Sequence, residues 1–85
     1  LMVMKIDELV SVVWYFDANK KKTVLVKVVW KSRTYKVNEV GLHHTFKSGE
    51  SLIHVFSVVA GDLFFRLEFN SVNLQWKLKE VGDGL

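Results

Sequence analysis

The stretch from Leu52 to Phe69, LIHVFSVVAGDLFFRLEF, decides the fold. Apolar residues alternate with other side chains on both sides of Ala60-Gly61, a pattern typical of two strands joined by a tight turn, with glycine supplying the positive φ. A two-residue turn there pairs Val58 with Leu63, Phe56 with Phe65, His54 with Leu67, and Leu52 with Phe69. All eight side chains then point to one face, and seven of them are apolar.

The chain continues this face beyond Phe69. A loop over residues 70–73 places Leu74 beside Phe69, Trp76 beside Leu67, and Leu78 beside Phe65. Three consecutive strands thus agree on one apolar face, and such agreement predicts an antiparallel meander.

The upstream half has the same period of two. Val24, Val26, Val28 and Trp30 alternate with other residues, and a turn at Ser32-Arg33 pairs Trp30 with Tyr35 and Val28 with Val37. The next core position would fall on Glu39, so we expect a bulge near Asn38-Glu39 that returns Val40 and Leu42 to the core and bends the strand.

We therefore expect strands at about 9–16, 23–31, 34–40, 51–59, 62–69 and 74–80, with residues 41–49 forming the longest irregular connection. Residues 5–13 also fit a short helical turn. The prediction is an all-β fold: a small antiparallel SH3-like barrel, or a strongly curved meander of five to six strands. Residues 1–85 make one small domain, which buries only about 60–65% of its unfolded surface and so needs efficient packing or a partner.

Composition excludes several classes of protein. The chain is 49% hydrophobic, which is incompatible with intrinsic disorder, and it has no cysteine for disulfides or thiolate metal sites. No apolar stretch approaches the roughly 20 residues that span a bilayer, and no secretory signal pattern is present. We expect a soluble cytoplasmic domain that is not bound to membranes.

Few features of the sequence indicate catalysis or metal binding. His43 and His44 are adjacent, so on an extended chain they point to opposite sides and cannot easily share an ion. His54 lies on the inner face, and we expect a buried core histidine that is hydrogen-bonded, for example to the 42–49 connection. The glycines are scattered and form no phosphate-binding loop. We predict no enzyme, no cofactor and no metal.

The net charge of +3 is unevenly distributed. Residues 1–40 carry eight cations and four acidic residues, residues 41–85 carry four and five, and no acidic residue lies between Ala18 and Asn38. Basic residues with exposed aromatic rings are typical of surfaces that bind single-stranded nucleic acid. The candidate residues are Lys20, Lys21, Lys22, Lys27, Lys31, Arg33, Lys36, Phe64, Arg66, Lys77 and Lys79, although lysine-rich outer faces also serve solubility.

Some apolar residues are expected on the outer face of the sheet. Exposed apolar clusters often mark interfaces with other proteins. The candidate interface residues are Leu25, Val29, Ile53, Val55 and Phe64. Association with protein, including a homodimer, is the leading functional hypothesis, and single-stranded nucleic-acid binding is the second.

The segment Trp30-Lys-Ser-Arg-Thr-Tyr-Lys-Val-Asn-Glu-Val40 resembles a hairpin of short uncharacterised bacterial all-β domains. Later pieces, His54-Val-Phe56, Phe65-Arg-Leu67 and Trp76-Lys-Leu78, occur in a similar order, so the likeness covers about residues 24–80. Some relatives are appended to accessory DNA polymerases of the translesion type. The resemblance implies a shared fold and no catalytic residue; Ser32 stands where those domains have a turn glycine.

Overall fold

The computed structural model describes residues 2–83, in which all regular structure is β-strand. The strands are β1 (Val3–Asp17), β2 (Lys22–Trp30), β3 (Arg33–Lys36), β4 (Glu39–Ser48), β5 (Ser51–Ala60), β6 (Leu63–Asn70) and β7 (Trp76–Asp83). The predicted all-β class is confirmed. The described residues form seven strands where five to six were expected.

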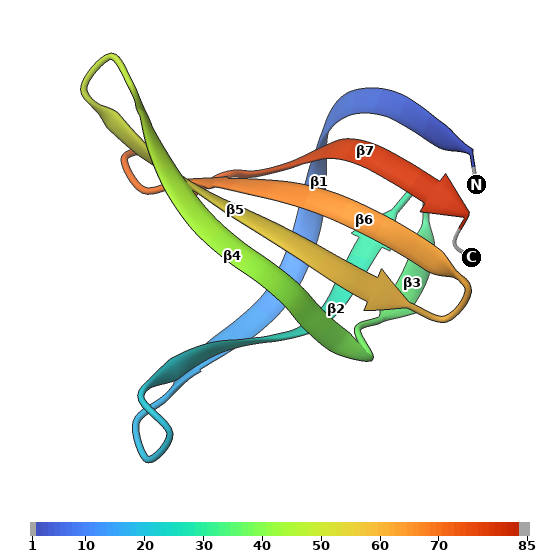
Figure 1. The fold of residues 1–85 in the computed structure, drawn as a ribbon, viewed down its shortest axis with the longest axis horizontal. Helices are drawn as coiled ribbons and strands as arrows, with labels where there is room; N and C mark the ends of the chain where they lie inside the picture. The colour runs from blue at the N-terminus through green and yellow to red at the C-terminus, as the bar shows by residue number, and fades with distance from the viewer. Residues whose placement is uncertain (1, 84–85) are drawn as a thin grey trace.

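The strands form one antiparallel sheet in the order β3-β2-β1-β7-β6-β5-β4 (Figure 1). Two meanders, β1–β3 and β4–β7, are joined because the first strand pairs with the last. β3 and β4 are the two edges, so the sheet is strongly curved but strand pairing does not close it into a ring.

β1 belongs to both halves of the sheet. Its first part, from Val3 to Val10, pairs with β7, and its second part, from Ser11 to Asp17, pairs with β2. A bulge opposite Lys79 interrupts the first part, where Asp7 has a φ of 73°. Such bulges bend a strand. Residues 3–17 belong to a β-strand with no helical turn, so the helical turn considered for residues 5–13 is wrong.

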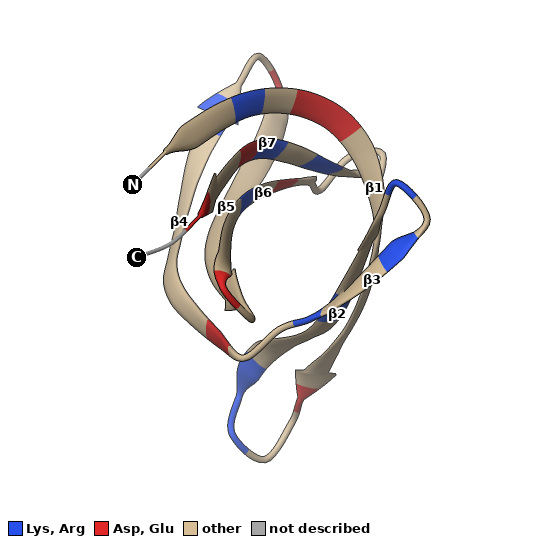
Figure 2. Ribbon diagram, turned by 90° about the vertical axis from the view of Figure 1, so that its right-hand side faces the viewer, with Lys and Arg blue, Asp and Glu red and all other residues tan. Residues whose placement is uncertain are grey.

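This curvature folds the two halves of the sheet over one core (Figure 2). Phe65 of β6 is fully buried, and its ring meets Trp30 of β2 and Tyr35 of β3 edge-on. The core cluster draws on β2, β5, β6 and β7, and its buried members are Leu25, Val28, Phe56, Val58, Ala60, Phe65, Leu67, Trp76, Leu78 and Val81.

The predicted inner face is largely correct, but all three hairpin registers differ from prediction. Gly61 and Asp62 form the β5–β6 turn, so Val58 opposes Phe65 and His54 opposes Phe69. After the longer loop at 71–75, Phe69 opposes Trp76.

In the β2–β3 hairpin, Trp30 opposes Arg33 because the turn residues are Lys31 and Ser32, both with positive φ. Each pairing has slipped by two residues, and a slip of two by itself leaves side chains on their predicted faces. Only the cross-strand partners change.

The segment 41–49 is the largest correction. It was expected to be irregular, but most of it belongs to β4, which pairs with β5. The bulge lies at Gly41 and not at Asn38-Glu39. At Asn38-Glu39 the chain crosses from β3 to β4. Val40 and Leu42 do not return to the core: they are 38% and 56% exposed.

Candidate binding surfaces

The predicted apolar interface is largely internal. Leu25 is 4% exposed because Val26 is an extra residue opposite Val13 and Trp14, which turns Leu25 to the inner face. Ile53 and Val55 do lie on the outer face, but neighbours on β4 and β6 leave them 7% and 1% exposed.

The remaining two, Val29 and Phe64, are half-buried. The five residues therefore do not form an exposed patch.

The cations of the predicted aromatic and basic patch on β6 and β7 form ion pairs with nearby carboxylates. Lys79 donates a hydrogen bond to Asp7 at 2.9 Å, and Arg66 lies 3.9 Å from Glu80. Lys77 is also 4.0 Å from Asp7. The hydrogen bond from Lys79, followed by the charges of both lysines, lowers the pKa of Asp7, and that bond raises the pKa of Lys79. These cations have local counter-ions, which makes the patch a poor phosphate surface.

The other seven predicted cations lie on β2, β3 and the turns beside them, and none has an ion pair with any residue from 2 to 83. Lys27 and Lys36 are cross-strand partners, which places two cations side by side. The Nζ of Lys31 lies over the Trp30 ring, 5.3 Å from its centroid. Figure 2 shows these basic positions along β2, β3 and their turns. Lys20, Lys21 and Lys22 crowd the β1–β2 turn.

β4 is an edge strand with a continuous exposed length. All ten of its residues are exposed, and on its register with β5 Leu42, His44 and Phe46 share the outer face. Leu42 is 56% and Phe46 42% exposed. An edge of this length presents unpaired backbone N–H and C=O groups to any approaching strand.

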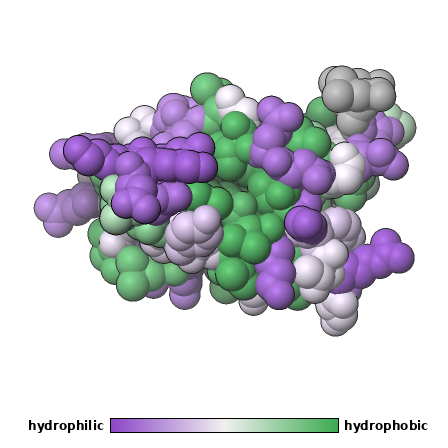
Figure 3. All heavy atoms as spheres, turned by 90° about the horizontal axis from the view of Figure 1, so that it is seen from below, coloured by the Kyte–Doolittle hydropathy of each residue, from purple (hydrophilic) through white to green (hydrophobic). Residues whose placement is uncertain are grey.

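A cleft of about 760 Å³ lies between β4 and the projecting β1–β2 hairpin. Its lining includes Phe16, Lys21 and Lys22 from the hairpin, and His43 and Phe56 from the opposite side. Figure 3 shows apolar side chains reaching the surface across the middle of one face, with hydrophilic side chains on either side of them.

A stack of rings forms one wall of this cleft. His43 lies flat on Phe56, with centroids 4.2 Å apart and planes 7° apart, and its Nε2 is 2.9 Å from Nδ1 of His54. Trp14 and Phe69 continue the aromatic cluster beyond Trp76. Burial, followed by the charges of His54 and His44, lowers the pKa of His43 and so favours its uncharged form.

The histidines match their predictions in part. His43 and His44 point to opposite faces, as expected, and His54 does bond to the segment 42–49 through His43. His54 is half-buried where full burial was predicted. Within residues 2–83, no group of three or more His, Cys, Asp or Glu side chains is placed to hold a metal ion.

Several surface residues were missed by sequence reasoning. Trp14 and Phe16 were placed on a strand without a role, yet both line surface pockets. Phe46 was placed in an irregular connection. The available signal was the run Val12-Val-Trp-Tyr-Phe16, in which five consecutive apolar residues cannot all face the core of a strand pair.

Compared with known proteins, the chain matches no family model, no curated protein and no solved structure. The resemblance to short bacterial domains therefore stays a prediction. In the described part of the chain, no helix is long and apolar enough to cross a bilayer.

Proposed function

We propose that this chain is a non-catalytic protein-association module that pairs with a second copy of itself along β4. The observation that carries the proposal is the edge itself: ten residues long and exposed at every position. Natural sheets usually protect such edges with proline, several lysines or a short strand. β4 has no proline and a single lysine, Lys47.

The bulge at Gly41 limits the regular part of the edge to residues 42–48. In a symmetric antiparallel pair, opposed residues point to the same face, so the two-fold axis passes through one residue position. An axis at His44 sets Leu42 against Phe46 of the second copy, and His43 against Thr45. This register buries the two most exposed apolar side chains of the regular segment against each other.

The gain can be scaled from the exposed fractions. Completing the burial of Leu42 and Phe46 contributes about 1 kcal/mol for each side chain, or about 4 kcal/mol for the four in a dimer. Backbone hydrogen bonds add to this, and the loss of rotational and translational freedom opposes it. We expect a weak dimer with a dissociation constant on the order of 100 µM.

Sedimentation velocity from about 10 µM to 1 mM tests association, and charge substitutions test the register. Leu42→Glu alone and Phe46→Arg alone each place a charge against an apolar side chain, and each should weaken the dimer at least about tenfold. The double variant Leu42→Glu/Phe46→Arg should restore association, because the register opposes the two new charges, which have opposite sign.

Leu9→Glu is the matched control, since Leu9 is 61% exposed on β1 and far along the sheet from β4. It should leave association unchanged. A chain that stays monomeric at 1 mM would refute the proposal. A double variant no better than either single one would refute the register.

A further inference from the structure

The cleft between the β1–β2 hairpin and β4 combines charge with flat apolar rings. Lys21 and Lys22 line it directly, and Lys20 precedes them in the same turn. The backbone N–H groups of Asn19 and Lys20 donate to Asp17 Oδ1, which fixes the conformation of this turn.

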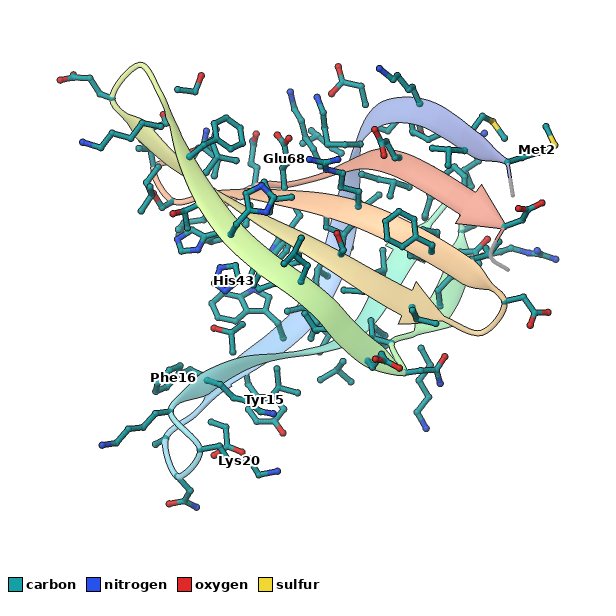
Figure 4. The ribbon with its side chains drawn as sticks, in the orientation of Figure 1. Met2, Tyr15, Phe16, Lys20, His43 and Glu68 are labelled. Atoms are coloured by element: carbon teal, nitrogen blue, oxygen red, sulfur yellow. The ribbon has the colours of Figure 1, made fainter. Side chains whose placement is uncertain are left out.

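The opposite wall of the cleft is fixed by contacts within the protein. The His43 ring is held by its bond to His54 and by its stack on Phe56, and it remains exposed on the cleft side. Phe16, on the hairpin, is 60% exposed. Figure 4 shows Phe16 and Lys20 on the projecting hairpin, and the His43 ring on the side of β4 that faces it.

We propose that this cleft binds single-stranded nucleic acid, with a base against Phe16 and the His43 ring and the adjoining phosphates on Lys21 and Lys22. Aromatic platforms inside a positively charged groove are the means by which proteins hold unpaired strands. The base must be unstacked to enter, which excludes a regular duplex.

Charge favours this occupant over a polypeptide strand. The lysines of the turn have no ion pair among residues 2–83, whereas the cations of β6 and β7 already have Asp7 and Glu80. Glu39 is the one carboxylate among the described lining residues. A carboxylate can accept a hydrogen bond from the exocyclic amino group of a base.

The nucleic-acid site and the proposed dimer overlap only at Leu42, which also lines the cleft. His43 faces the cleft, while His44 and Phe46 lie on the outer face of β4. Phe46→Arg therefore tests the dimer without touching the cleft, and the hairpin substitutions test the cleft without touching the paired edge, so the two proposals can fail independently.

The test is fluorescence anisotropy with a labelled 12-nucleotide oligodeoxycytidylate at about 20 and 200 mM salt. We expect saturable binding that weakens with salt. Lys21→Gln/Lys22→Gln should lower the affinity and reduce the slope of log affinity against log salt by about 1.4, since each lost phosphate contact accounts for about 0.7. Phe16→Ala should lower the affinity about 5- to 100-fold through lost stacking.

Lys5→Gln/Lys77→Gln is the matched control, because it removes two charges from exposed lysines outside the cleft. Its affinity should stay within about twofold of the parent chain, and circular dichroism should show all variants folded. No binding at 20 mM salt would overturn the proposal. So would an equal loss in the control, or equal affinity for a duplex of the same length.

Discussion

Replacement of Phe65 by alanine should cost more stability than any surface change in this protein. Phe65 is 0% exposed, and its ring lies 5.1 Å from Tyr35 and 6.2 Å from Trp30, at 90° and 80°. Through these two rings Phe65 packs the β2–β3 hairpin against β6. Phe65→Ala removes a fully buried ring and leaves a cavity, for which we expect a loss of about 4 kcal/mol.

That loss is large for a domain of this size. An 85-residue chain has about 4–13 kcal/mol of unfolding free energy, so Phe65→Ala removes about 30% of it or more. The melting temperature should fall by about 15–30 °C. Urea unfolding followed by tryptophan fluorescence measures the change, because Trp30 lies beside the substituted ring.

The neighbouring residue provides a matched control. Phe64 is on the outer face, half-buried, and opposes Gly82. Phe64→Ala should cost about 1 kcal/mol. A coupling energy of about 0.5–1.5 kcal/mol is also expected between Phe65→Leu and Tyr35→Leu. If Phe65→Ala costs no more than Phe64→Ala, the packing of the β2–β3 hairpin on β6 described above is wrong.

Three further changes have defined outcomes. Ser32→Gly should stabilise the fold by about 1 kcal/mol, because Ser32 has a φ of 63° that only glycine adopts without strain; an unchanged or lower melting temperature would contradict this. Leu74→Gly should likewise raise the melting temperature, because Leu74 has the same φ of 63°. Leu74 is 67% exposed, so the substitution loses little burial. The lowered pKa of His43 means that the unfolded chain binds more protons below pH 6.5. Stability should therefore fall as the pH drops through 6.5 towards the folded-state pKa, and melting curves of His43→Gln from pH 8 to pH 5 should show a smaller fall than those of the parent chain.

Alternation along the strands predicted the inner face because side-chain direction has a period of two. A slip of two residues preserves that period, so the pattern could not distinguish a turn at Ala60-Gly61 from the observed Gly61-Asp62. Bulges break the period and were harder to place. Val26 is the extra residue of one such bulge, and it turns the side chain of Leu25 into the core.

β4 could not be predicted from hydrophobic pattern for a different reason. An edge strand exposed on both faces has no buried side, so HHTFKS reads like a loop. The prediction of a free basic patch on β6 and β7 was wrong because the register differs from the expected one. The slip and the bulge at Lys79 set Arg66 opposite Glu80 and not Lys77, which replaces an expected repulsion with an ion pair.

Amide hydrogen exchange along β4 tests the central claim most directly. At about 10 µM the amides of 39–48 that point away from β5 should exchange as freely as those of an exposed edge. At about 1 mM those within 42–46 should become protected, while the other edge, β3, should not change. Exchange along β4 that is identical at both concentrations would contradict pairing of this edge with a second copy.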